Sequence, residues 1–287
     1  MAVDYAITGG SGQLGRALQA RCAERDRSCS APGHQEVAVE SASAVAAWLD
    51  RTRPAHVLHG AAWTDVDGCE RDPARAELHN GVATAQLAAA CAQRGIGMVY
   101  VSTDFVFDGT ASTPYRPDAA TAPLSAYGRS KRTGELAVLG HGRADFHVVR
   151  TSWVFGPHGK NFPKAILQRA QSGQPLAVVT DQRGRPTYAP DLAEALLDLV
   201  ERRAPGGIYH AANQGECTWH EFAGAVLAAA GLGHVEIGQT TAAQLARPAA
   251  RPAYSVLDTS DLDRVRGRSM PDYPSAIARW LRAEQLP

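Results

Sequence analysis

Two residues whose side chains can exchange a proton lie four positions apart in the stretch "YGRSK". Tyr127 and Lys131 open a helix-compatible run, and residues i and i+4 lie on one face of a helix. A lysine ammonium beside a phenol favours the phenolate, so we expect Lys131 to lower the pKa of Tyr127. Tyrosine would then act as a general acid–base near neutral pH.

A third group comes from the end of a strand predicted over residues 97–102. The stretch "VYVSTDFVFDG" places Ser102, Thr103 and Asp104 there, at the edge of a sheet where ligands bind. Thr103 could donate a hydrogen bond to a carbonyl oxygen on which negative charge develops. Because a tyrosine and a lysine at this spacing also occur on solvent-facing helices, the prediction of a catalytic pair depends on Thr103 and on a cofactor loop.

A glycine-rich loop near the N-terminus joins a strand pattern, "YAIT", to a helix pattern. Gly9, Gly10, Gly12 and Gly15 satisfy both GxxGxxG and GxGxxG. Such glycines permit a tight turn and a close approach of backbone amides to a pyrophosphate, and the helix N-terminus adds unpaired N–H groups. The loop predicts a dinucleotide site; the alternative is an ordinary turn between a strand and a helix.

The end of the second strand should decide between NAD and NADP, because an acidic residue there binds the ribose 2′-hydroxyl and repels a 2′-phosphate. We place this position in "SAPGHQE", around Gly33 and His34, where no acidic residue precedes Glu36. This favours NADPH, with NADH as an alternative. His34 is equally compatible with an ordinary loop.

The elements that must position these groups alternate between strand and helix patterns. Strands are predicted over 5–8, 56–62, 97–102 and 146–155, and helices over 13–25, over 73–94 and from Tyr127. This alternation predicts an α/β fold with a Rossmann-like, doubly wound parallel sheet. After residue 155 the predicted helices are 161–173, 189–203, 218–232 and 273–284, the strands are 175–179 and 206–212, and 247–262 is rich in loops.

We expect two structural units from this pattern. A dinucleotide-binding domain should comprise residues 1–155, completed by about 186–212. A smaller C-terminal α/β substrate-binding lobe should comprise residues 156–185 and 213–287 and lie over the carboxyl edge of the sheet, where open α/β sheets bind ligands.

Composition excludes several classes of protein. The 29 basic and 29 acidic side chains give no general attraction to nucleic acid or anionic lipid. No apolar run approaches the roughly 20 residues of a membrane span, and no signal region precedes the first strand. Five cysteines, an odd number without CxxC spacing, argue against a zinc site or a disulfide framework. We therefore expect a soluble, cytoplasmic protein without a metal, a nucleic-acid partner or a membrane partner.

Together these motifs resemble the short-chain dehydrogenase/reductase superfamily in its extended form, which acts on nucleotide sugars. The resemblance is greatest to the dTDP-4-dehydrorhamnose reductase family and related deoxysugar 4-ketoreductases. Similar stretches occur in family order from residue 7 to about residue 258, namely "GGSGQLGRAL", "AAWTDVDGCERDP", "STDFVFDG", "PLSAYGRSKRTGE", "RTSWVFGPHGKNF", "DQRGRPT" and "ARPAYSVLD".

The resemblance implies an NADPH-dependent reductase of a dTDP-4-keto-6-deoxyhexose. Tyr127 would give a proton to the C4 carbonyl oxygen, Lys131 would hold the nicotinamide ribose and Thr103 would orient the carbonyl, while the nicotinamide delivers hydride to C4. The implied cofactor-binding residues are Gly9, Gly12, Gln13, Leu14, Gly15, Ala61, Ala62, Ser102, Tyr127 and Lys131. The implied substrate-binding residues are Thr64, Val66, Asp104, Phe105, Trp153, Asn161 and Arg251, and Asn80 would lie behind the site.

Some of these residues have structural alternatives. Trp153 could pack beneath the cofactor, Asn161 could cap a helix, and Arg251 could be a solvated loop charge. An arginine suits a nucleotide diphosphate because its planar fork pairs with phosphate oxygens. The acidic stretch "DVDGCE" at 65–70 could hold a metal, but a polar loop leading into a helix is the interpretation that we favour.

The chain also departs from the family. His59 and Gly60 stand where relatives usually have an asparagine before the Ala-Ala pair, and Phe105 stands where many have tyrosine. Arg16 stands where some relatives have an acidic residue tied to a metal-linked dimer, so we expect no such metal and either a monomer or a homodimer.

Three other functions compete with the 4-ketoreductase. The departures leave open a reductase or an epimerase of another nucleotide sugar in secondary metabolism. A non-catalytic regulatory subunit is disfavoured because Thr103, Tyr127 and Lys131 are all present. A hydrolase is excluded because Gln13 replaces the last glycine of a GxSxG elbow in "GGSGQ".

Overall fold

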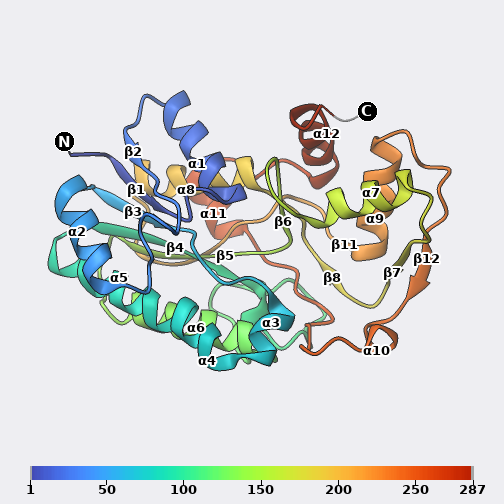
Figure 1. Cartoon of the computed structure of the whole chain (residues 1–287), viewed down its shortest axis with the longest axis horizontal. Helices are drawn as coiled ribbons and strands as arrows, with labels where there is room; N and C mark the ends of the chain where they lie inside the picture. Colours follow the sequence, from blue (N-terminus) through green and yellow to red (C-terminus); the bar gives the residue numbers. More distant parts are fainter. Residues whose placement is uncertain (1, 286–287) are drawn as a thin grey trace.

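A parallel sheet of six strands forms the centre of the molecule (Figure 1). The structure, a computed structural model, describes residues 2–285. The strand order is β10-β5-β4-β3-β1-β2, and all five pairs of neighbours are parallel. The predicted α/β fold is therefore confirmed. The strands are β1 (Tyr5–Thr8), β2 (Cys29–Ser30), β3 (His56–His59), β4 (Gly97–Thr103), β5 (Phe146–Thr151) and β10 (Gly207–His210).

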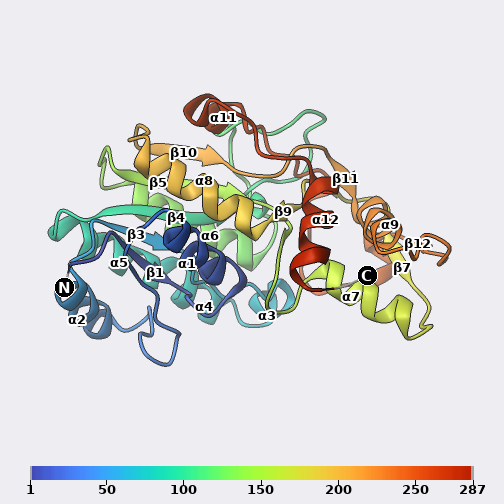
Figure 2. The ribbon, with the colours of Figure 1, turned by 90° about the horizontal axis from the view of Figure 1, so that it is seen from above.

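Helices cover both faces of this sheet, as Figures 1 and 2 show. One face carries α1 (Gln13–Glu24), α8 (Ala189–Glu201) and α11 (Ser260–Arg266), and the other carries α2 (Ala42–Thr52), α5 (Ala83–Gln93) and α6 (Ala126–Leu139). Successive side chains of a strand point to opposite faces. Accordingly, Tyr5 and Ile7 join the core under α1 and α8, whereas Ala6 joins the core under α2 and α5.

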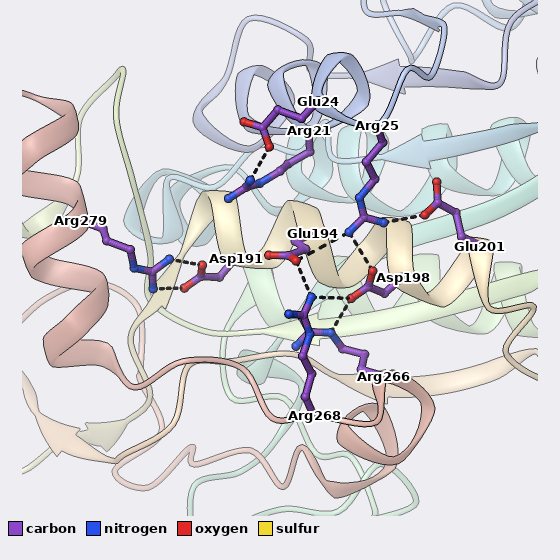
Figure 3. Close-up of polar contacts among 10 residues, drawn as sticks. All are labelled: Arg21, Glu24, Arg25, Asp191, Glu194, Asp198, Glu201, Arg266, Arg268 and Arg279. Carbon is purple, nitrogen blue, oxygen red and sulfur yellow. Dashed lines mark hydrogen bonds and ion pairs between the residues drawn. The ribbon is translucent and has the colours of Figure 1, made fainter.

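Ion pairs fasten α8 to its neighbours (Figure 3). Asp198 accepts hydrogen bonds from Arg25, just beyond α1, at 2.8 Å and from Arg266 of α11 at 2.9 Å. Asp191, at the start of α8, pairs with both terminal nitrogens of Arg279 in α12 (Tyr273–Ala283). These contacts link the helix layer of the sheet to the C-terminal part of the chain.

A separate hydrophobic core lies beyond the sheet, at the right of Figure 1. It is built around Phe155, Phe222 and Trp280. The division of the chain into a dinucleotide-binding domain and a substrate-binding lobe stays a prediction. The elements of this region are β6 (Val154–Phe155), α7 (Phe162–Gln171), β7 (Ala177–Val179), β8 (Arg183–Gly184), β9 (Thr187–Tyr188), β11 (Cys217–Thr218), α9 (Trp219–Ala229), β12 (Gly238–Thr240) and α10 (Ala242–Leu245).

The helix predicted over 73–94 is present but changes its winding. It comprises α4 (Pro73–Ala76), a π-helical turn η1 (Glu77–Val82) and α5. Two short helices, α3 (Val66–Arg71) and the 3₁₀ turn η2 (Asp104–Val106), complete the loops above β3 and β4. Single π turns inside helices are frequent at functional sites.

Several predicted boundaries were wrong. The strand predicted over 56–62 ends at His59, and the one predicted over 146–155 ends at Thr151. The latter breaks because Trp153 takes a left-handed backbone conformation, with φ of +48°, before β6 begins. Helix α2 was missed, and α11 begins inside the stretch predicted to be rich in loops. Between residues 2 and 285, no helix is both long and apolar enough to cross a membrane.

Candidate active site

The glycine loop closes tightly over the end of β1. Gly9 has a φ of +71°, and its carbonyl accepts a hydrogen bond from Gly12 N at 3.0 Å. A Cβ at Gly15 would lie 2.1 Å from the Gly9 carbonyl oxygen, so only glycine fits between loop and helix. Helix α1 begins without a side-chain cap, which leaves its first amides free to face an anion. This cradle fits the pyrophosphate of a dinucleotide.

A cavity of about 820 Å³ opens beside this loop and gathers most of the predicted residues. Its wall contains Thr103, Tyr127 and Lys131, and it contains every residue that we expected at the cofactor. The predicted substrate-binding residues in the wall are Thr64, Val66, Asp104, Phe105, Trp153 and Arg251.

Tyr127 lies in the first turn of α6, which Ser125 caps by accepting a hydrogen bond from Gly128 N. Its ring packs edge-on against Phe105, and Thr103 lies close enough to its hydroxyl to influence its pKa. Burial raises the pKa of Tyr127 above its usual value, which outweighs the opposing effect of Thr103. We expected Lys131 to lower this pKa, and that expectation was wrong for this arrangement. The phenol therefore keeps its proton at neutral pH.

Lys131 is almost fully buried and points along β4. Its Nζ donates to the Val101 carbonyl at 2.8 Å and lies 4.2 Å from the centroid of the Tyr100 ring. Burial lowers the pKa of Lys131 to about 7, and the negative charge of Glu135 opposes that change. Because the lysine donates to β4, its charge is not among the influences on the Tyr127 pKa, which burial dominates.

The turn after β4 fixes the hydroxyl of Thr103. This hydroxyl donates to Asp104 Oδ1 at 3.0 Å and accepts a hydrogen bond from Phe105 N at 3.2 Å. Burial raises the pKa of Asp104 to about 6. Thr103 and Asp104 thus form a small polar group beside the tyrosine hydroxyl.

His59, one of the departures from the family, is fully buried behind the cavity. Its Nδ1 lies 2.7 Å from Thr8 Oγ1, and its Nε2 lies 3.0 Å from Thr84 Oγ1. Because the Thr84 hydroxyl donates to the Asn80 carbonyl, His59 must donate through Nε2. Burial and the charge of Lys131 lower the pKa of His59 to about 3, so the ring is neutral.

Asn80, in the π turn, holds the loop that follows β3. Its Oδ1 accepts from Trp63 N at 2.8 Å, and its Nδ2 donates to Trp63 O at 3.1 Å and to Ser130 Oγ at 3.0 Å. The Thr8 hydroxyl also accepts from Ala61 N. These bonds fix Ala61 and Trp63 at the edge of the sheet between the glycine loop and α6.

Two tryptophans stack at the other end of the cavity. The rings of Trp153 and Trp219 lie 3.6 Å apart at their centroids, with an angle of 11° between their planes. A Cβ at Gly184 would lie 2.7 Å from the Trp153 ring, so this ring packs closely against Gly184 as well as against Trp219. Trp153 therefore both packs and lines the cavity, and its role in substrate binding stays a prediction.

Arg251 and Asn161 occupy different positions relative to the cavity. Arg251 lies in the wall, where its Nη2 is 3.1 Å from Asp67. Burial opposes ionisation of Asp67, but hydrogen bonds from Arg251 and Ala249 N hold its pKa below the usual value. Asn161 caps α7 by accepting a hydrogen bond from Lys164 N. It is not among the residues of the cavity wall, but its Nδ2 donates to Oε1 of Gln13, which is.

The acidic stretch at 65–70, which we expected to be a polar loop leading into a helix, is the N-cap and most of the helix α3 itself. Asp65 caps this helix by accepting from Gly68 N at 2.9 Å. Within residues 2–285, no group of three or more His, Cys, Asp or Glu residues is arranged to hold a metal ion.

The first acidic residue after β2, Glu36, is not part of the cavity wall. Glu36 Oε2 accepts a hydrogen bond from Gly33 N at 2.8 Å. His34 and Glu40 do line the cavity, with His34 Nε2 3.4 Å from Glu40 Oε1. Glu40 was not predicted because it follows the strand by ten residues. The cavity also includes Gly60, one of the departures from the family, and residues that the sequence did not single out, namely Ser11, Val39, Trp63, Arg75, His79, Val101, Thr151, Ser152, Val154, Lys160 and Trp219.

Comparisons with known proteins agree with this geometry. Residues 4–286 match the family model described as the RmlD substrate binding domain. The chain is 42% identical over 277 residues to a probable dTDP-4,6-dihydroxy-2-methyloxan-3-one 4-ketoreductase of Streptomyces antibioticus, covering 95% of this chain and 92% of that protein. It is 40% identical to a dTDP-4-dehydrorhamnose reductase of Streptomyces griseus, covering 89% and 86%.

Solved structures show the same similarity. The crystal structure of a dTDP-4-dehydrorhamnose reductase from Bacillus anthracis in complex with NADP is 31% identical, with a TM-score of 0.93. The match covers 99% of this chain and 100% of that chain. A second such enzyme, from Clostridium acetobutylicum, is 32% identical with a TM-score of 0.93, covering 98% of this chain and 99% of that one.

Proposed function

The chain belongs to the RmlD substrate binding domain family, and we propose that it is an NADPH-dependent 4-ketoreductase of a dTDP-4-keto-6-deoxyhexose. One observation carries this proposal. Thr103, Tyr127 and Lys131 line a single cavity together with the glycine loop at the carboxyl edge of the sheet. This is the arrangement that proton transfer to a carbonyl beside a dinucleotide requires.

Tyr127 is the proton donor in this proposal. Burial keeps its phenol protonated at neutral pH, so it has a proton to give to the carbonyl oxygen of the sugar. The Thr103 hydroxyl, which donates to Asp104 in this structure, would turn to the same carbonyl oxygen when the sugar binds and give that oxygen a second donor. A reduced nicotinamide, when bound, supplies hydride to the carbonyl carbon.

Lys131 assists through its charge. Once a bound cofactor and sugar exclude water from the cavity, this ammonium would stabilise the phenolate that remains after proton transfer, an effect that is absent from the Tyr127 pKa in this structure. Its three N–H donors also suit the hydroxyls of a ribose. The loop held by His59 and Asn80 would place Ala61 and Ala62 along the same cofactor.

NADPH is the expected cofactor, and NADH is compatible with the same site. The glycine loop and the free amides of α1 would hold the pyrophosphate. The acidic side chain nearest in sequence to the end of β2, Glu36, accepts a hydrogen bond from Gly33 N and is not part of the cavity wall, whereas Glu40 lines the wall beside His34. The solved relative from Bacillus anthracis was crystallised with NADP.

The substrate would occupy the part of the cavity that the C-terminal residues complete. Residues 156–185 and 213–287 would form the substrate-binding lobe, and residues 1–155 with 186–212 the dinucleotide-binding domain. Trp153 and Trp219 offer flat apolar surface to a 6-deoxyhexose, and Arg251 offers positive charge to a diphosphate. Thr64, Val66, Asp104 and Phe105 line the space between them.

A second candidate exists for the identity of the substrate sugar. The relative that is 42% identical is named for a different dTDP-keto sugar, and another, 36% identical, is named a dTDP-4-keto-6-deoxy-D-glucose reductase. Phe105, which lacks a hydroxyl, and the unusual His59 and Gly60 are also compatible with a different nucleotide sugar. A reductase of such a sugar would use the same Tyr127 chemistry.

Turnover measurements test the proposal. The chain would be supplied with NADPH or NADH and with dTDP-4-keto-6-deoxyhexoses of both C5 configurations, and the product would be identified by NMR. We expect oxidation of NADPH and a 4-hydroxy product. Oxidation of neither cofactor with any of these sugars would overturn the proposed function.

A further inference from the structure

Glu135 is a fully buried carboxylate on the same face of α6 as the two reactive residues. It follows Tyr127 by eight residues and Lys131 by four, so the three side chains lie in line along the helix. Its exposed fraction is 0%. A buried ionised carboxylate is costly unless it is paired, so its contacts indicate what it serves.

The carboxylate joins β4 and β5 to α6. Glu135 Oε1 accepts from the Ser102 hydroxyl at 2.6 Å. Arg150 donates to both carboxylate oxygens, from Nε at 2.8 Å and from Nη2 at 2.9 Å, and Arg132 donates to Oε2 at 2.8 Å. Burial opposes ionisation, but these hydrogen bonds hold the pKa of Glu135 below its usual value.

Arg150 is itself held in place, which makes the pair rigid. Its Nη1 donates to the Pro117 carbonyl at 3.1 Å, and its guanidinium lies 5.0 Å from the centroid of the Phe107 ring. His210, 3.5 Å from Arg150, is neutral because burial and the arginine charge lower its pKa to about 3. The position of the Glu135 charge is therefore fixed relative to β4.

We propose that Glu135 is a positioning residue of the reaction, whose buried carboxylate holds Ser102 in the cavity wall and counterbalances the positive charge of Lys131. The role in the reaction rests on the proposed function, whereas the effect on Lys131 does not. Buried ion pairs contribute little net stability, so stability alone is a weak reason for this one. Two of the residues that it acts on, Ser102 and Lys131, belong to the cavity wall.

The surroundings of Lys131 leave Glu135 as its main electrostatic partner. Burial lowers the pKa of Lys131, and the negative charge of Glu135 raises it. Tyr100 contacts the ammonium with an uncharged ring, and His59 is neutral. The titratable and charged groups around Lys131 and Glu135 are His59 of β3, Tyr100 of β4, Asp104 of η2, Tyr127 and Arg132 of α6, and Arg150 of β5.

The composition of the chain allows a direct test. The sequence contains three lysines, Lys131, Lys160 and Lys164, so selective ¹³Cε-lysine labelling gives a simple NMR spectrum. A pH titration of the Lys131 signal reports its pKa without any need for turnover. We expect a value near 7 in the native chain. In Glu135→Gln we expect it to fall by about one unit or more, because the opposite charge is lost.

Conservative and paired variants complete the test. Glu135→Asp keeps the charge, so the Lys131 pKa should stay closer to the native value than in Glu135→Gln. If Glu135→Gln does not fold because Arg150 keeps an unpaired charge, the double variant Glu135→Gln/Arg150→Gln removes both charges together. It should also lower the Lys131 pKa, but by less than Glu135→Gln alone, because loss of the Arg150 charge partly offsets loss of the Glu135 charge.

Asp198 provides a matched control (Figure 3). It is another buried carboxylate between two arginines, Arg25 and Arg266, but it lies on α8, across the sheet from α6. Asp198→Asn should lower thermal stability and leave the Lys131 titration unchanged. Any folded variant without the Glu135 charge whose Lys131 pKa equals the native value would overturn the proposal.

Turnover adds a second readout. The alkaline limb of kcat/KM should move to lower pH in Glu135→Gln and stay in place in Asp198→Asn. A native chain that oxidises no cofactor would refute the proposed function, while the NMR titration would still decide the role of Glu135.

Discussion

The ammonium of Lys131 lies against the face of the Tyr100 ring, 4.2 Å from its centroid, and not against Tyr127. Tyr100 is fully buried, so the lysine charge is held in an apolar place, in contact with the ring and with the Val101 carbonyl. This burial brings the pKa of Lys131 to about 7. The lysine therefore titrates in the pH range where turnover is measured.

The first prediction concerns pH. If catalysis needs charged Lys131, kcat/KM should be constant at lower pH and fall as the pH rises through about 7, because the ammonium exists below its pKa. The measurement is a pH profile of NADPH oxidation. A Lys131→Arg variant keeps its charge to high pH, so its residual activity should lack this limb. A native profile that stays flat well above neutral pH would contradict the role of Lys131.

A second prediction concerns the proton donor. Tyr127→Phe should lower kcat by roughly 10²–10⁴-fold, the usual contribution of general acid catalysis, and should retain NADPH binding. Tyr209→Phe is the matched control, because its hydroxyl donates to the Pro205 carbonyl, away from the cavity. Turnover would be followed by NADPH oxidation and binding by fluorescence titration. Near-native turnover in Tyr127→Phe would rule out the tyrosine as donor.

The glycine loop gives a third prediction, which separates folding from binding. A Cβ at Gly15 would lie 2.1 Å from Gly9 O, so Gly15→Ala should cost about 1–3 kcal/mol or more of stability. A Cβ at Gly12 meets only Gly9 O, at 3.3 Å, so Gly12→Ala should fold and mainly weaken cofactor binding. Thermal unfolding and NADPH titration distinguish the two. Equal loss of stability in both variants would be inconsistent with this loop geometry.

The stacked tryptophans give a fourth prediction. Trp219→Ala should raise KM for the sugar nucleotide about two- to tenfold, the value of a lost aromatic pair, without changing NADPH affinity. Trp219→Phe should largely restore KM. Near-UV circular dichroism should report the loss of the stack with Trp153. An unchanged KM in Trp219→Ala would show that the stacked tryptophans contribute to packing and not to substrate binding.

Much of the sheet was predictable because its strands carry clear local signals. The pattern "YAIT" followed by spaced glycines identified β1, the loop and α1, and all three are present. Helix α2 was missed because its core face rests on Val45, Trp48 and Leu49 within a small-residue stretch. The cap at Ser41, which accepts from Ala44 N, was the signal that could have found it.

The site shows where prediction from sequence ends. Spacing placed Tyr127 and Lys131 on one helix face, but spacing could not show that the lysine would bind Val101 O and lie on Tyr100. Those contacts depend on how β4 packs against α6. Trp219 and Glu40 reach the cavity from elements distant in sequence, so only the folded chain brings them there.

The transfer of hydride can be followed directly. NADPH carrying deuterium at the transferred position of the nicotinamide would be incubated with the chain and a dTDP-4-keto-6-deoxyhexose, and the product would be analysed by NMR. A 4-ketoreductase predicts one deuterium, at C4 of the sugar, with the reaction lost in Tyr127→Phe. Deuterium at any other carbon of the hexose, or a product without deuterium, would contradict the proposed reaction.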